Sequence, residues 1–303
     1  MPYNPTMTKS AHDPEIPSGS PPERISDEDY VDRVGSFYSS LADATALSRA
    51  AAGRQAGERR HWASVLFTRL CNTACSVVVM CPRNPFNHPD RDHWDMSAIA
   101  SLTRNLVECS FALHYLAFDE VGDDEWLTRL NLMQLHDCVT RHKIFSDLTP
   151  DDPDIDGFAV QAEELRNRLL TRKHFTSLPE KQRKRFLTGD HAWLLTQDEI
   201  LTRMGQAENT RNFRGMWRYL STHAHTFPVA FYRMAEQGSG HGLENNKEKG
   251  MITLVLLPYG EEVLRAATKR FNALFPDVDI AKELEAIGKR EGKRALRSRT
   301  LIR

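Results

Sequence analysis

The chain has 303 residues, with 40 Lys and Arg against 41 Asp and Glu, and 40% of its residues are hydrophobic. Charges so nearly balanced exclude a uniformly basic nucleic-acid coat protein and an acidic, solvating chain. No uninterrupted apolar run approaches the roughly 20 residues needed to cross a bilayer, so we expect no membrane-spanning segment. The start of the chain has no secretory pattern, and its five cysteines are irregularly spaced, so we predict a cytoplasmic protein.

The two ends of the chain differ in composition from the middle. Residues 1–25 contain six prolines among Ser and Gly, with too little apolar surface to fold, and predict a disordered N-terminal lead. Residues 276–303 predict a basic tail, helical or disordered, in which 289–303 carry seven Lys and Arg against one Glu. Such a tail can attract phosphate groups, or it can be an ordinary solvated terminus. Between the two, residues 26–275 are predicted to form a single helical domain.

Apolar residues recur every three or four positions along most of this domain, which is typical of helices that bury one face. A helix is predicted to begin near Ser26, a residue type that caps helix N-termini, and to end near Ala51. Further helices are predicted over 58–79, 95–118, 124–148, 158–172, parts of 179–204, 209–223 and 261–275. The segment 237–250 is predicted to be a mobile loop, and 251–257 is either a strand or a buried helix. The predicted fold class is therefore all-α, a helical bundle.

Charged residues lie beside the apolar stripe of the helix predicted over 95–118. Arg104 and Glu108 are four positions apart, so they can pair on one face of the helix. They continue a polar line that begins at Ser97 and Ser101. The pair can be structural, or it can belong to a binding site.

A second charged line follows the helix predicted over 209–223. Arg211, Arg214 and Arg218 lie along it, and guanidinium groups this close require carboxylates or a bound anion, with Glu108 as one candidate partner. Burying an unpaired ion costs on the order of several kcal/mol. The two lines therefore predict either closed ion pairs or an anion site in a polar cleft shared by the two helices.

The end of this second helix carries two Arg–His spacings. Four residues separate Arg218 from His223, and six separate it from His225. This pattern resembles the Arg-x4–6-His signature of the HEPN superfamily, which are all-helical proteins that include metal-independent ribonucleases. Nucleases of that superfamily commonly place a polar residue directly after the arginine, whereas this chain has Tyr219 there.

A wider likeness covers about residues 60–275. It is carried by the helix around Leu102–Leu116, by Phe186-Leu187-Thr188-Gly189 and by the segment Arg218–Met234. These features resemble an uncharacterised bacterial helical family.

The HEPN resemblance implies an endoribonuclease that needs no metal ion or other cofactor and that often builds its site across a homodimer. A histidine with an ordinary pKa near 6.5 would accept the proton of a ribose 2′-hydroxyl. Arg218 would hold the phosphate and stabilise its developing charge, giving a 2′,3′-cyclic phosphate and a 5′-hydroxyl. Arg104, Glu108, Arg211 and Arg214 would support anion binding. The sequence leaves open whether His223 or His225 is the base.

The same residues also fit a non-catalytic hypothesis. In that case the chain is a helical module that dimerises or binds a nucleotide or another phosphate-bearing anion, and the two histidines satisfy backbone groups at a helix end. The partners expected under the two hypotheses are RNA or a nucleotide and a second copy of the chain, with no membrane. Metal-capable residues also gather at 88–95, but they match no ligand spacing, and helix capping by Asp92 or Asp95 explains them, so no metal site is predicted.

Overall fold

The computed structural model describes residues 24–54, 57–86, 92–228, 230–232, 241–286 and 288. Within these ranges the regular elements are all helices, apart from an isolated β-bridge between Trp94 and Gly242. The predicted all-α fold is therefore confirmed. Residues 1–23 and 289–303, which hold nearly all of the predicted lead and the basic end of the tail, lie outside the described residues.

The helices follow one another along the chain with short connections. In chain order they are α1 (Asp27–Ala50), α2 (Glu58–Met80), α3 (Met96–Leu113), the π-helix η2 (His114–Phe118), α4 (Asp123–Leu148), α5 (Ile155–Thr171), α6 (Lys173–Ser177), α7 (Glu180–Leu187), α8 (Gln197–Arg203), the short η3 (Ala207–Asn209), α9 (Thr210–Ala224), α11 (Asn246–Met251), the π-helix η4 (Ile252–Leu256) and α12 (Leu257–Leu274). Ser26 caps α1 as predicted, because its side chain accepts a hydrogen bond from the Asp29 backbone N–H at 3.0 Å.

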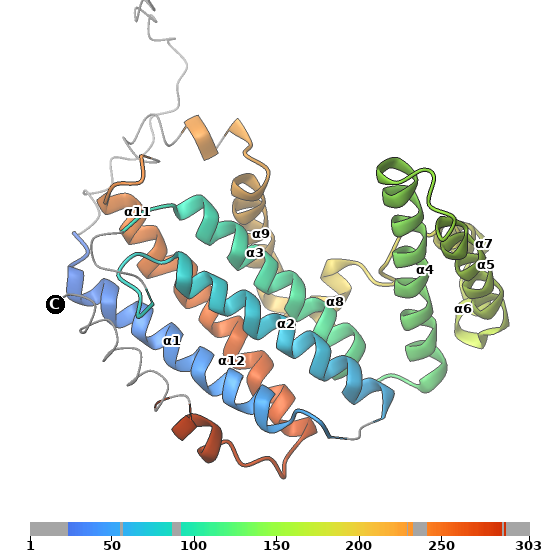
Figure 1. Cartoon of the computed structure of the whole chain (residues 1–303), viewed down its shortest axis with the longest axis horizontal. Helices are drawn as coiled ribbons and strands as arrows, with labels where there is room; N and C mark the ends of the chain where they lie inside the picture. The colour runs from blue at the N-terminus through green and yellow to red at the C-terminus, as the bar shows by residue number, and fades with distance from the viewer. Residues whose placement is uncertain are drawn as a thin grey trace, which may run out of the picture.

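Helices α1, α2, α3 and α12 lie side by side as a bundle, and α9 packs along α3 (Figure 1). The core contains the stacked rings of Phe67 and Phe271, whose centroids are 4.0 Å apart. Helices α1 and α12 approach closely at Gly260, where a Cβ atom would meet the Phe37 ring at 3.1 Å. The buried apolar side chains of five helices thus form one continuous core.

Helices α4 to α7 form an arm that projects from the bundle (Figure 1). The arm has its own apolar core, composed of Leu132, Leu135, Cys138, Ala162, Leu165, Leu169, Phe175 and Phe186. A third apolar cluster joins α3 and η2 to α8, with Phe111 and Tyr115 packed near Ile200 and Leu201. Met133 of α4 packs against this cluster, and Trp126 Nε1 of α4 donates to the Leu116 carbonyl, so the arm and the bundle meet through buried contacts as well as through the chain.

The structure corrects one predicted segment and decides between the two alternatives for another. Residues 246–251 form α11 instead of a loop, because Asn245 caps the helix by accepting from the backbone N–H groups of Lys247 and Glu248. Residues 251–257 are helical, not a strand: they are the end of α11, the π-helix η4 and the first residue of α12, so one helical path runs from Asn246 to Leu274. Residues 237–240 of the predicted loop lie outside the described ranges.

Among the described helices, α2 alone is long and apolar enough to cross a membrane by length and composition. A helix at the centre of a bundle has the same composition, and α2 packs against α1, α3 and α12. This single helix is therefore weak evidence for a membrane span.

Candidate functional site

The two helices predicted to share a site, α3 and α9, pack directly against each other. Near the start of α3, the Ser97 hydroxyl lies 3.0 Å from Nδ1 of His223. Two turns further along, the guanidinium of Arg104 lies over the ring of Trp217, 4.9 Å from its centroid. We call this line of contacts the α3–α9 seam: Ser97, Arg104, Glu108, Trp217 and His223.

Arg104 is held within the seam by two neighbours. Its Nη2 atom lies 2.8 Å from a carboxylate oxygen of Glu108, and its side chain is only 19% exposed. A cation over the face of an indole ring gains further electrostatic stabilisation. Glu108 is therefore the partner of Arg104, and no contact between Glu108 and Arg218 is found among the described residues. The predicted pairing of Glu108 with Arg218 was wrong, because Arg104 lies one turn away on the same helix face.

His223 is buried at the other end of the seam. Besides its contact with Ser97, its ring packs edge-on against Tyr219 at 4.9 Å. Burial lowers the pKa of His223, and the charge of Asp95 only partly opposes this effect. The imidazole is therefore neutral at neutral pH, and its Nδ1 atom is occupied by a partner within the protein.

His225 lies in a different environment, although it is only two residues away. Helix α9 ends at Ala224 with His225 as its C-cap, so the helix does not continue through both histidines. The side chain of His225 is exposed, and its ring centroid lies 5.5 Å from that of Phe227. Of the two predicted bases, His225 can be reached from solvent in this conformation and His223 cannot.

The three predicted arginines of α9 lie on its exposed side. We call Arg211, Arg214 and Arg218 the α9 arginine face. Arg214 forms a two-pronged ion pair with Asp198 of α8, with 3.0 Å between Nε and Oδ1. Arg211 and Arg218 form no ion pair with any residue that the structure describes.

This arrangement corrects the predicted polar cleft. The apolar side of α9, with Phe213, Met216 and Leu220, packs onto the bundle, and the amphipathic pattern therefore turns the arginines outward. Arg104 lies inside the seam and the α9 arginine face lies outside it. Trp217 belongs to both surroundings, because its ring lies under Arg104 in the seam and also lines the hollow beside the arginines.

A shallow hollow of about 330 Å³ adjoins the α9 arginine face. Its lining residues come from α9 and from the start of α8: Thr196, Gln197, Asp198, Arg214, Trp217 and Arg218. An exposed guanidinium beside a half-buried indole ring can bind a phosphate and stack a planar group at adjacent positions.

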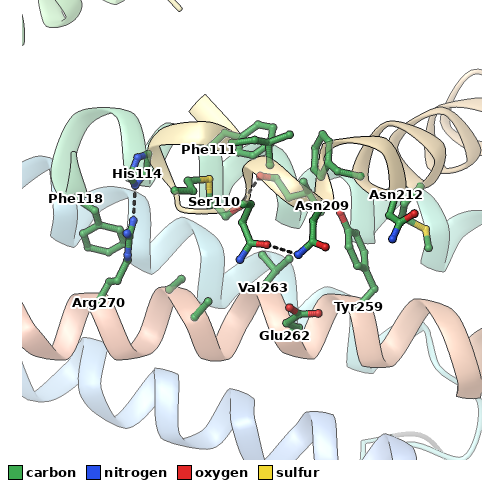
Figure 2. A pocket seen from close by; sticks show the side chains of 18 residues that line it. Ser110, Phe111, His114, Phe118, Asn209, Asn212, Tyr259, Glu262, Val263 and Arg270 are labelled. Atoms are coloured by element: carbon green, nitrogen blue, oxygen red, sulfur yellow. Dashed lines mark hydrogen bonds between the residues drawn. The ribbon is translucent and has the colours of Figure 1, made fainter. Parts of the chain in front are cut away.

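A second and more enclosed cavity, of about 390 Å³, lies between α3, the segment from α8 to α9, and α12. Figure 2 shows His114 and Arg270 at one end of it and Asn209, Tyr259 and Glu262 further along. Sequence reasoning did not find this cavity, because His114 and Arg270 are 156 residues apart and no local spacing links them.

The described residues contain no group of three or more His, Cys, Asp and Glu side chains arranged to hold a metal ion. Asp95 caps α3 by accepting from the Ala98 backbone N–H, as predicted, and Asp92 accepts from the Arg83 backbone N–H. His88 and Asp90 of the metal-capable cluster lie outside the described residues.

The fold and the site together define an all-helical bundle protein with a polar seam and an outward arginine face on one helix. The profile of a family of unknown function (DUF5677) matches residues 60–241, which is more than half of the chain, so the chain belongs to this family. The predicted likeness to an uncharacterised family is thereby confirmed, and the match includes both helices of the seam. Searches of curated proteins and of solved structures found no match to the chain.

Proposed function

We propose that the chain is a metal-independent endoribonuclease of the HEPN type that acts on RNA in the cytoplasm through the exposed end of α9. The observation that carries the proposal is that Arg218 is exposed and lacks an ion-pair partner among the described residues, and that the exposed His225 follows it seven residues later at the C-cap of the same helix. Seven residues correspond to two helical turns, or about 10 Å along the axis.

In the proposed reaction, His225 accepts the proton of a ribose 2′-hydroxyl. The 2′-oxygen attacks the adjacent phosphorus while Arg218 donates hydrogen bonds to the phosphate oxygens and stabilises the added charge. The bond from phosphorus to the 5′-oxygen breaks, and that oxygen takes a proton from solvent. The products are a 2′,3′-cyclic phosphate and a 5′-hydroxyl, and the face of Trp217 offers a stacking surface for a neighbouring base.

The seam residues have a supporting part in this proposal. Arg104, Glu108 and His223 have partners inside the protein, so they fix how α9 lies on α3 and thereby where Arg218 and His225 are presented. We further propose that two copies of the chain associate as a homodimer, which brings a second Arg218 and His225 to the same RNA.

The test is cleavage of a single-stranded RNA oligonucleotide in excess EDTA. We expect wild-type protein to yield 2′,3′-cyclic phosphate ends, and we expect Arg218→Gln and His225→Ala to lose at least about a hundredfold in rate, the size of one acid–base or charge-stabilising contribution. Both variants should keep the wild-type melting temperature, because both side chains are exposed. His61→Ala is the matched control, since His61 is also exposed and also lies beside an aromatic ring, that of Trp62.

His223→Ala separates the two histidines. It should lower the melting temperature, because it removes a buried ring and the partner of Ser97, but the folded fraction should still cleave RNA. Cleavage that persists in Arg218→Gln, or that depends on His223 and not on His225, would contradict the assignment.

The same assay distinguishes a second function, a non-catalytic module that binds RNA or a nucleotide. The observation in its favour is that no described contact joins Arg218 to either histidine. Salt-sensitive RNA binding that Arg218→Gln abolishes, with no cleavage by any variant, would identify this function.

A further inference from the structure

We propose that the enclosed cavity between α3, α9 and α12 binds a small organic acid, with its apolar body inside the cavity and its carboxylate at Arg270. This inference is independent of RNA binding, because the α9 arginine face is on the opposite, exposed side of α9. The cavity volume of about 390 Å³ falls within the range of about 300–1,000 Å³ that small-molecule sites occupy.

The walls of the cavity favour a ligand with an apolar body. Phe111, Phe213, Met216 and Val263 are among the side chains that line it, and they come from three helices. Most of the surface that lines the cavity is apolar, and polar side chains at several positions can orient a ligand by hydrogen bonds, as is typical of small-molecule sites. Among them, Asn209 Nδ2 donates to Gln206 Oε1 at 2.7 Å, and both residues line the cavity, with Asn209 near its middle (Figure 2).

Arg270 supplies the charge that would hold an acid. It is the only Lys or Arg among the described lining residues, and it forms no ion pair with any residue that the structure describes. One N–H of its guanidinium is directed at His114, and the remaining N–H groups suffice for a two-pronged contact with a carboxylate. Glu262 is eight residues earlier on α12, about 12 Å along the axis, so the cavity has one cationic end. A single cation favours a singly charged carboxylate over a phosphate dianion.

His114 holds Arg270 in place. The side chain of His114 is buried, and its Nδ1 atom lies 2.5 Å from Nη1 of Arg270. Because the guanidinium can only donate, Nδ1 accepts and the ring proton is on Nε2. Burial and then the charge of Arg270 lower the pKa of His114 to about 4, which keeps the ring neutral and able to accept at neutral pH. His114 is therefore a positioning residue for Arg270.

Two further features of this end of the cavity fit a ligand site. Nε2 of His114 is buried and has no hydrogen-bond partner among the described residues, which is uncommon for a buried polar atom. His114 also begins the π-helix η2, whose last residue, Phe118, lines the same end of the cavity. Single π-helical turns within α-helices occur frequently at functional sites.

The test is binding of 4-phenylbutyrate, indole-3-acetate and octanoate to the full chain, each compared with its uncharged primary amide. We expect at least one acid to raise the melting temperature saturably at millimolar concentration and to bind about tenfold or more tightly than its amide. Arg270→Gln should remove this preference for the acid. Lys269→Gln, which changes the neighbouring exposed cation outside the cavity, should keep it.

Two more variants make the outcome specific to the cavity. Ala266→Leu adds volume at the wall and should weaken the acid and the amide alike. His114→Leu should weaken the acid more than the amide, and His114→Gln, which retains an acceptor, should recover part of the loss. The proposal is overturned if no acid binds saturably, if acid and amide bind equally, or if Arg270→Gln and Lys269→Gln behave alike.

Discussion

Thr226 has a left-handed backbone conformation, with φ of 51°, directly after the exposed His225. It follows the C-cap of α9, where the Phe227 N–H donates to the Thr222 carbonyl at 3.0 Å, and the Thr226 N–H donates to the His223 carbonyl at 3.4 Å. This is the Schellman arrangement, in which glycine is the usual residue. A β-branched residue there is strained, and strained residues cluster at functional sites.

Thr226→Gly should therefore stabilise the protein. Removing the side chain relieves the strain of the left-handed backbone conformation, which is about 1 kcal/mol or more. Glycine also gives the unfolded chain more backbone freedom, and this effect offsets part of the gain in stability. We expect a net gain of about 0.5–1 kcal/mol, or roughly 1–4 °C in melting temperature. Thr226→Ala is the control, because it keeps the Cβ atom and should gain less. A glycine variant no more stable than the alanine variant would show that the turn is unstrained.

Residue identities at the site could be predicted from the sequence, but their surroundings could not. The position of Arg218 near the end of an arginine-lined helix, with two histidines after it, singled out Arg218, His223 and His225, whereas the spacing alone also fits other Arg–His pairs in the chain. Four-residue spacing placed Arg104 beside Glu108. Which histidine is buried depends on where α9 ends, and that end is set by the left-handed turn at Thr226, a residue type that rarely adopts this conformation. The local sequence pattern does not indicate this turn, and so it does not predict which of the two histidines is buried.

At the scale of elements, a buried ionic cluster ties α4 to the bundle. The side chain of Arg129 on α4 is completely buried, and it donates to the Tyr115 carbonyl at 2.9 Å. It also lies 2.7 Å from Asp119 and 2.5 Å from Glu125, and both carboxylates have a second partner in Arg203 of α8. Three segments therefore converge on one guanidinium at the base of the arm.

Arg129→Met should destabilise the protein by about 3–5 kcal/mol in urea unfolding, because it leaves two partly buried carboxylates undercompensated. Arg141→Met, which removes an exposed pair with Asp137 on the same helix, should cost at most about 1 kcal/mol. Equal effects of the two substitutions would contradict the account of the cluster.

The cost of Arg129→Met should also depend on pH. Burial alone would raise the pKa of Asp119, but hydrogen bonding and charge attraction from Arg129 and Arg203 outweigh it and lower that pKa below its ordinary value of 3.8. A lowered carboxylate pKa contributes stability above pH 3.8, and this contribution is lost as the pH falls through the folded-state pKa. The difference between wild type and Arg129→Met should therefore shrink below about pH 4.

The sequence predicted the positions of the helices more accurately than it predicted the π-helical turns within them. Apolar periodicity located α2, α3, α4 and α9 to within a few residues, because each buries one face of a bundle. The π-helices η2 and η4 were not predicted. Neither proline nor glycine lies within or beside η2, and Gly250 and Pro258, which flank η4, do not distinguish a π-helical turn from a strand in so short an apolar run. The role of Arg129 was not predicted either. Most of its partners lie on neighbouring elements, and the sequence pattern of one helix does not show which elements pack against it.

At the scale of the whole molecule, the charged residues of α3 and α9 fall into two groups that have different roles. The α3–α9 seam is closed by its own partners and sets the packing of the two helices. The α9 arginine face is turned to solvent, with Arg211 and Arg218 lacking protein partners among the described residues. The cleft expected between the helices is thus replaced by a partly buried seam and an exposed face. The second cavity behind α9 depends on α12, which the family match does not include.

The central claim is that the exposed face of α9 binds the phosphates of RNA, whether or not cleavage follows. The most direct measurement is the salt dependence of single-stranded RNA binding by wild type, by Arg218→Gln, and by Arg168→Gln, which changes an exposed arginine on the arm. Each lost phosphate contact reduces the slope of log K against log salt by about 0.7. We predict this reduction for Arg218→Gln and none for Arg168→Gln, whereas identical slopes for all three proteins, or no RNA binding by wild type, would contradict the claim.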